Sequence, residues 1–130
     1  MNNEFPRPLN QGERELLVHL LTKFLPARKD DLNQLDQTVV VGKCPCGCPT
    51  IHLWKATEAP PPGKVGKFFW YGIGKNFADE PVGLLLFETD GVLSCLEIVP
   101  YGDERACGLP RLDSIEASPP VLPPARSGAA

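Results

Sequence analysis

The first hydrophobic pattern in the chain has the spacing of an amphipathic helix. Asn10 and Glu13 match the N-x-x-E form of a capping box, in which each side chain bonds the backbone of the other residue. Behind this box, apolar residues recur every three or four positions: Leu16, Leu17, Leu20, Leu21 and Phe24. The spacing predicts a helix over residues 11–25, which Pro26 ends, with the leucines facing a core.

The hydrophobic period changes from helical to strand-like near Thr38. A second, shorter helix is predicted before this point, from Lys29 to Leu35. The β-branched run Val39–Val41 then predicts one strand, and Thr50–Trp54 predicts another. The turn between these strands contains Cys44–Cys48, so the cysteines are expected at the tip of a hairpin.

Three further strands are predicted in the second half of the chain. Phe68–Tyr71 is the most aromatic stretch and predicts a third strand, followed by a loop through Gly72, Gly74 and Asn76. Val82–Phe87 and Val92–Val99 flank Asp90-Gly91, which is the strongest short hairpin signal in the sequence.

The two-residue turn of that last hairpin fixes an expected register. Thr89 should face Val92, and Phe87 should face Ser94. Both faces of the hairpin are partly apolar, which predicts a central position in the sheet with helices packed on one side.

Helical spacing followed by strand spacing indicates an α+β domain. We expect one or two N-terminal helices packed on an antiparallel sheet of four or five strands. The chain has 130 residues, which is room for one core. We predict a flexible N-terminus over residues 1–8, a single domain over 9–116, and a Pro/Ala-rich disordered tail over 117–130.

Charge and cysteine content argue against several classes of protein. The formal net charge is -3 and the pI is about 5.3, without the basic stripe that binding to nucleic acid or to a membrane surface needs. No apolar segment has the pattern of a signal peptide or a membrane span. Five cysteines, three of them within five positions, are a poor framework for a secreted disulfide-rich domain. These features predict a cytoplasmic protein.

The cysteine turn has three interpretations. Cys44, Cys46 and Cys48 are spaced to chelate a soft metal such as zinc, with His52, Cys95 or Cys107 as a fourth ligand. They are also small side chains in a bend that Pro45, Gly47 and Pro49 form. The third interpretation is redox chemistry, through a strained disulfide between Cys44 and Cys48.

Candidates for acid–base chemistry are few. The chain has two histidines: His19 is expected to be solvated beside Glu15 on the first helix, whereas His52 lies close to the cysteines. Glu97 interrupts an apolar strand, where it is either an inward carboxylate or part of the solvated face. These residues do not form a recognisable catalytic set, so we predict no enzyme activity. The alternative enzyme would use a cysteine nucleophile with His52.

Three segments together resemble a family of small bacterial proteins for which no function is established. They are the leucine helix that opens at Leu9–Glu13, the turn Cys46-Gly47-Cys48-Pro49-Thr50, and the hairpin segment Asp90–Glu97. The resemblance covers roughly residues 9 to 112. It implies that the cysteine turn and the hairpin belong to one domain, and it implies no activity.

The sequence therefore predicts a small, non-enzymatic cytoplasmic protein that acts by binding another protein, as an adaptor or an immunity-type inhibitor. The expected partner-binding residues are Phe68, Phe69, Trp70 and Tyr71, because aromatic side chains are enriched at interfaces. The alternative is a zinc-binding or redox-sensing protein that uses Cys44, Cys46, Cys48 and His52. No cofactor other than this zinc is expected.

Overall fold

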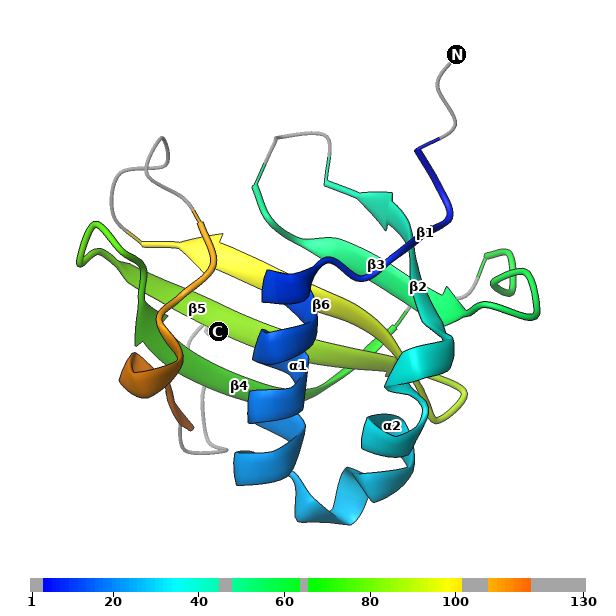
Figure 1. Cartoon of the computed structure of the whole chain (residues 1–130), viewed down its shortest axis with the longest axis horizontal. Coiled ribbons are helices and arrows are strands. Elements are labelled where there is room, and N and C mark those ends of the chain that lie inside the picture. Colours follow the sequence, from blue (N-terminus) through cyan, green and yellow to red (C-terminus); the bar gives the residue numbers. More distant parts are fainter. Residues whose placement is uncertain (1–3, 45–47, 64–65, 102–107, 118–130) are drawn as a thin grey trace, which may run out of the picture.

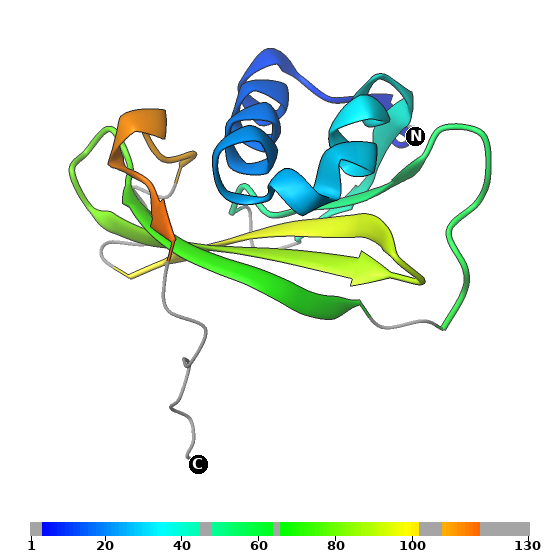
Figure 2. The same ribbon diagram turned by 90° about the horizontal axis from the view of Figure 1, so that it is seen from below.

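The computed structural model describes residues 4–44, 48–63, 66–101 and 108–117. Within them, two α-helices lie on one face of an antiparallel sheet, and the opposite face carries no helix (Figures 1 and 2). The elements in chain order are β1 (Arg7–Pro8), α1 (Gln11–Phe24), η1 (Pro26–Arg28), α2 (Lys29–Asn33), η2 (Leu35–Gln37), β2 (Thr38–Lys43), β3 (Ile51–Lys55), β4 (Lys67–Lys75), β5 (Pro81–Thr89), β6 (Val92–Pro100), η4 (Leu112–Ser114) and β7 (Glu116–Ala117). The predicted α+β class is confirmed.

Helix α1 begins at the predicted capping box. The Asn10 side chain accepts a hydrogen bond from the Glu13 backbone N–H at 2.8 Å, and the Glu13 carboxylate accepts one from the Asn10 backbone N–H at 2.9 Å. The helix ends at Phe24, and Pro26 starts a 3₁₀ turn that leads into α2. Its leucine stripe is buried against the sheet, as the spacing predicts: Leu16, Leu17, Leu20 and Leu21.

The described residues form a seven-stranded sheet in the order β1-β2-β3-β6-β5-β4-β7. The prediction of four or five strands is therefore too low, because it missed the two short edge strands β1 and β7. Arg7–Pro8 pairs with β2, and Glu116–Ala117 pairs with β4. Each has two residues, too few to show an alternating hydrophobic pattern. Arg7 and Pro8 also belong to the segment that the sequence assigns to a flexible N-terminus.

The β5–β6 hairpin occupies the predicted central position. Asp90 and Gly91 both have positive φ angles, 54° and 82°, as a type I′ turn requires. Thr89 faces Val92 as expected, but a bulge follows, so Phe87 faces Cys95 and not Ser94. A bulge adds one residue to one strand, and this shift was not visible in the hydrophobic pattern.

Strand β4 is longer than the sequence predicts. It continues through Gly72 and Gly74 to Lys75, where a loop was expected. Gly72 is buried under the Trp70 ring and beside β7: a Cβ atom at this position would overlap the Trp70 ring and lie 3.0 Å from the Glu116 carbonyl oxygen. The glycine is thus required by close packing within a strand and does not mark a turn.

The core lies between the helices and the sheet. Side chains from every second position of the central strands meet the leucine stripe there: Ile51 and Leu53 from β3, Leu84 and Leu86 from β5, and Leu96 and Ile98 from β6. The helices found among the described residues are all too short or too polar to cross a membrane.

Candidate functional site

The helix-free face of the sheet carries the side chains that alternate with the core residues. This surface of β2–β6 is the helix-free face. On β3 and β6 the outward residues are His52, Trp54, Cys95 and Glu97. Because β3 and β6 pair directly, His52 lies opposite Cys95. Two strands that are distant in the sequence thus form one surface.

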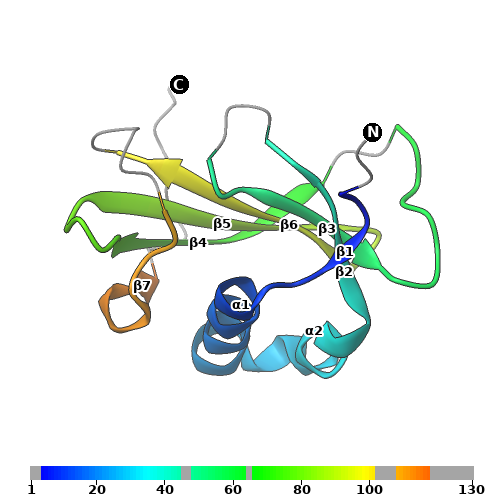
Figure 3. The same cartoon turned by 45° about the horizontal axis from the view of Figure 1, so that its top comes forward.

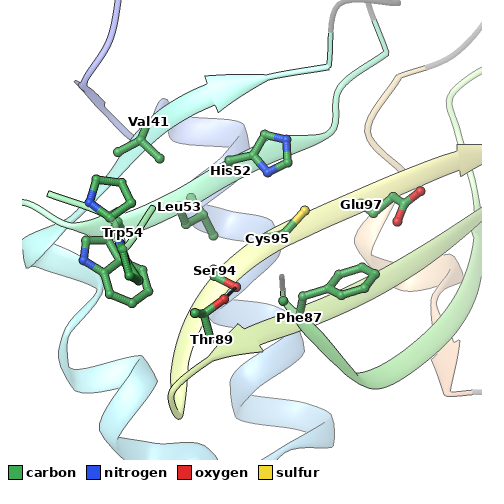
Figure 4. Close-up of a pocket in the computed structure, with 12 residues that line it drawn as sticks. Val41, His52, Leu53, Trp54, Phe87, Thr89, Ser94, Cys95 and Glu97 are labelled. Atoms are coloured by element: carbon green, nitrogen blue, oxygen red, sulfur yellow. Dashed lines mark hydrogen bonds between the residues drawn. The ribbon is translucent and has the colours of Figure 1, made fainter. Parts of the chain in front are cut away.

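A pocket of about 460 Å³ opens on this face (Figure 4). Its walls are mainly apolar and include several polar side chains. The apolar walls come from Val41, Trp54, Pro60, Pro61 and Phe87, and the polar groups are His52, Thr89, Ser94, Cys95 and Glu97. A concave, mainly apolar site of this volume with a few polar groups is typical of binding sites for small organic molecules.

Some polar groups of the pocket have a hydrogen-bond partner in the described part of the protein, and others do not. The Thr89 hydroxyl donates a hydrogen bond to the Ser94 hydroxyl at 2.9 Å. Trp54 is only 5% exposed, yet its indole Nε1 has no hydrogen-bond partner in the described part of the chain. Glu97 carries the sole formal charge among the described lining residues, and none of the described cations pairs with it.

Cys95 is a protonated thiol at neutral pH. Burial raises its pKa to about 12, and the nearby Glu97 carboxylate and Cys48 contribute to the rise. A thiolate is the form that attacks electrophiles or binds metal. Cys95 is therefore poorly suited to be the nucleophile beside His52.

Cys95 should react slowly with alkylating agents while the protein is folded. At pH 7.4 we expect iodoacetamide to modify it at least tenfold more slowly than in the urea-unfolded chain, because its raised pKa leaves little thiolate. Peptide mass spectrometry over a time course measures this rate for each cysteine. Equal rates in the folded and unfolded states would show that burial does not protect this thiol.

The predicted zinc ligands are described only in part. Cys46 lies outside the described residues, as does Cys107. Cys44 follows β2, and its backbone N–H donates a hydrogen bond to the Thr50 carbonyl at 3.4 Å. In the described ranges, no three Cys, His, Asp or Glu side chains are grouped closely enough to hold a metal ion. The zinc site at Cys44, Cys46, Cys48 and His52 stays a prediction.

The four predicted partner-binding aromatics are divided between the two faces of β4. Phe68 is 42% exposed on the helix-free face, where its ring contacts Phe87. Tyr71 lies on the same face, with its hydroxyl hydrogen-bonded to that of Tyr101 at 2.8 Å.

Phe69 and Trp70, in contrast, point toward the helices. The Arg28 guanidinium lies 4.0 Å above the Phe69 ring, and Trp70 packs against Phe24 of α1. A bulge between Phe68 and Trp70 places these two consecutive side chains on one side of the strand. These contacts stabilise the packing of the helices on the sheet, and Trp70 is only 8% exposed. A partner-binding role for Phe69 and Trp70 stays a prediction.

His19 differs from the solvated residue that the sequence predicts. Its Nε2 atom is buried without a hydrogen-bond partner in the described residues, and its ring is edge-on to Phe24 at 6.2 Å. Glu15, its predicted partner, accepts a hydrogen bond from Gln11 instead.

The sequence patterns single out some residues of the pocket, but they do not predict that these residues lie together. His52 and Glu97 stood out as polar residues within apolar strands. Val41, Phe87 and Trp54 join them only because β3 pairs with β6, and no local signal predicts this pairing. Comparison of the chain with models of protein families, with curated proteins and with solved structures found no match.

Proposed function

We propose that the protein is a non-enzymatic binding domain that recruits another protein through its helix-free face. The observation that carries this proposal is the exposure of large apolar side chains there: Phe68 is 42%, Ile73 is 41% and Tyr101 is 51% exposed. Both α-helices pack on the opposite face, so no helix of the described chain shields them (Figure 3). Exposed apolar residues gathered on one face mark interaction surfaces.

The chemistry of this face supports a protein partner. Phenylalanine and tyrosine contribute much of the binding energy at protein interfaces, because they bury a large area at a low entropic cost. Glu97 on the same face, and the net charge of -3, favour a partner with basic residues at the contact. An adaptor or an immunity-type inhibitor in the cytoplasm fits these properties.

The proposal is tested by removing the exposed apolar side chains of β4. The double variant Phe68→Thr/Ile73→Thr has a β-branched residue, which favours strands, at both positions and removes two of the large exposed apolar side chains. We expect recovery of the partner from cells that express the tagged protein to fall at least tenfold. Quantitative mass spectrometry of the co-purified proteins measures this change.

The matched control is Phe77→Thr, which removes an equally apolar residue that is 81% exposed in the turn between β4 and β5. This variant should retain the partner. Co-purified proteins that are indifferent to the double variant would refute the proposal. A homodimer in light scattering that the double variant dissociates would assign the face to a second copy of the chain.

A further inference from the structure

The pocket on the helix-free face has chemically different ends. Trp54 and Glu97 each lie two residues from the opposed pair His52 and Cys95, in opposite directions along the sheet. At about 3.3 Å per residue, the two ends are roughly 13 Å apart. Figure 4 shows the same arrangement: Trp54 lies at one end, Glu97 at the other, and Phe87 beside Cys95 between them.

The Trp54 end of the pocket favours an apolar group. Pro60 and Pro61, from the segment between β3 and β4, line the pocket together with Trp54 and Val41. The hydroxyls of Thr89 and Ser94 lie nearby and are hydrogen-bonded to each other, so this recess is mainly apolar. Binding of an aromatic or aliphatic group in this recess removes apolar surface of both the ligand and the protein from water.

The Glu97 end of the pocket favours a cation because of its charge. The Glu97 carboxylate is partly buried and has no ion-pair partner among the described residues, and the described lining includes no lysine or arginine that would attract an anion. A half-buried carboxylate gains most from a cation that replaces its lost hydration. The ring of Phe87 next to it adds a cation–π surface.

We infer that this pocket binds a small organic cation, with its apolar body against Trp54 and its ammonium group at Glu97. This inference goes beyond the proposed protein interface, and it is tested by a titration that needs no protein partner. The two results are therefore independent.

The test is a titration of the ¹⁵N-labelled full chain with three probes of matched length: 4-phenylbutylamine, 4-phenylbutanol and 5-phenylvalerate. The indole N–H signal of Trp54 reports on the pocket, and that of Trp70, which faces the helices, is the internal reference. We expect the amine to shift the Trp54 signal and the Cys95 and Glu97 amides with a Kd below about 1 mM. The carboxylate should bind at least tenfold more weakly.

The variant Glu97→Gln keeps the shape of the side chain and removes its charge. It should weaken the amine about tenfold and leave the affinity for the alcohol unchanged, which also shows that the pocket is intact. Glu116→Gln, an exposed carboxylate on β7, is the matched control and should bind the amine like the unmodified chain. Equal affinity for the amine and the carboxylate, or no shift of Trp54 at 10 mM amine, would overturn the inference.

Discussion

Replacing Gly72 with alanine is expected to lower the free energy of unfolding by about 3 kcal/mol, at the upper end of the usual cost of overpacking. The new Cβ atom would lie 2.9 Å from Cζ2 of Trp70 and 3.0 Å from the Glu116 carbonyl oxygen. The indole is packed against Phe24 of α1, with a centroid distance of 5.3 Å, and therefore has little room to move away. Urea unfolding followed by circular dichroism measures the difference.

The control for this prediction is Gly83→Ala in the neighbouring strand. The Cβ atom at residue 83 would also be tight, at 2.7 Å from the Tyr101 hydroxyl oxygen, but Tyr101 is half exposed and its ring can turn toward solvent. This variant should cost less than about 1 kcal/mol. Similar costs for both variants would mean that rigidity of the neighbouring side chain does not decide the effect.

Replacing Glu13 with glutamine is expected to lower the free energy of unfolding by about 2 kcal/mol at pH 7. The Glu13 carboxylate accepts two hydrogen bonds from Arg7, each at 2.9 Å, and one from the Asn10 backbone N–H. Its side chain is 7% exposed. This network fastens β1 to the start of α1, and a glutamine side chain is neutral and presents an amide N–H₂ group in place of one oxygen.

The same carboxylate makes the stability of the fold depend on pH. Burial alone would raise the pKa of Glu13, but the hydrogen bonds from Arg7 and Asn10, with the charges of Arg7 and Lys43, bring it below the ordinary 4.5. A group whose pKa is lower in the folded state stabilises the fold above its unfolded pKa, and this contribution is lost as the pH falls. The difference between Glu13→Gln and the unmodified chain should therefore shrink below about pH 4.5.

Urea titrations from pH 3 to pH 7 measure this difference, and Glu15→Gln is the matched control. Glu15 is exposed on the same helix and, among the described residues, accepts a side-chain hydrogen bond from Gln11 alone, at 2.9 Å. Its replacement should therefore change stability by less than about 0.5 kcal/mol. A Glu13→Gln effect that stays constant over the pH range would show that the ion pair with Arg7 does not stabilise the fold.

Features that depend on neighbours in the sequence were predictable. The capping box at Asn10 and Glu13 and the turn at Asp90-Gly91 each use contacts within a few residues, and both are present in the structure. The α+β class follows from the same local periodicity, because an amphipathic helix must cover an apolar sheet face.

The candidate site was predictable only residue by residue. His52 and Glu97 are unusual in their strands, and Phe68 is aromatic and exposed, which the sequence alone suggested. Which face each aromatic occupies was decided by a bulge in β4, and this separated Phe68 from Phe69 and Trp70. A shift of one residue moves a side chain to the other face of a sheet, so a single bulge changes the surface without changing the hydrophobic pattern.

By itself, the sequence determined the helix, the turns and the alternation of strands, since these follow from hydrogen bonds and periodicity within short segments. Only the tertiary structure decided that β3 lies beside β6 and that β4 lies beyond β5. That order depends on contacts between residues far apart in the chain, which no local pattern encodes. It brings Trp54, His52, Cys95 and Glu97 onto one open face, and so creates the pocket.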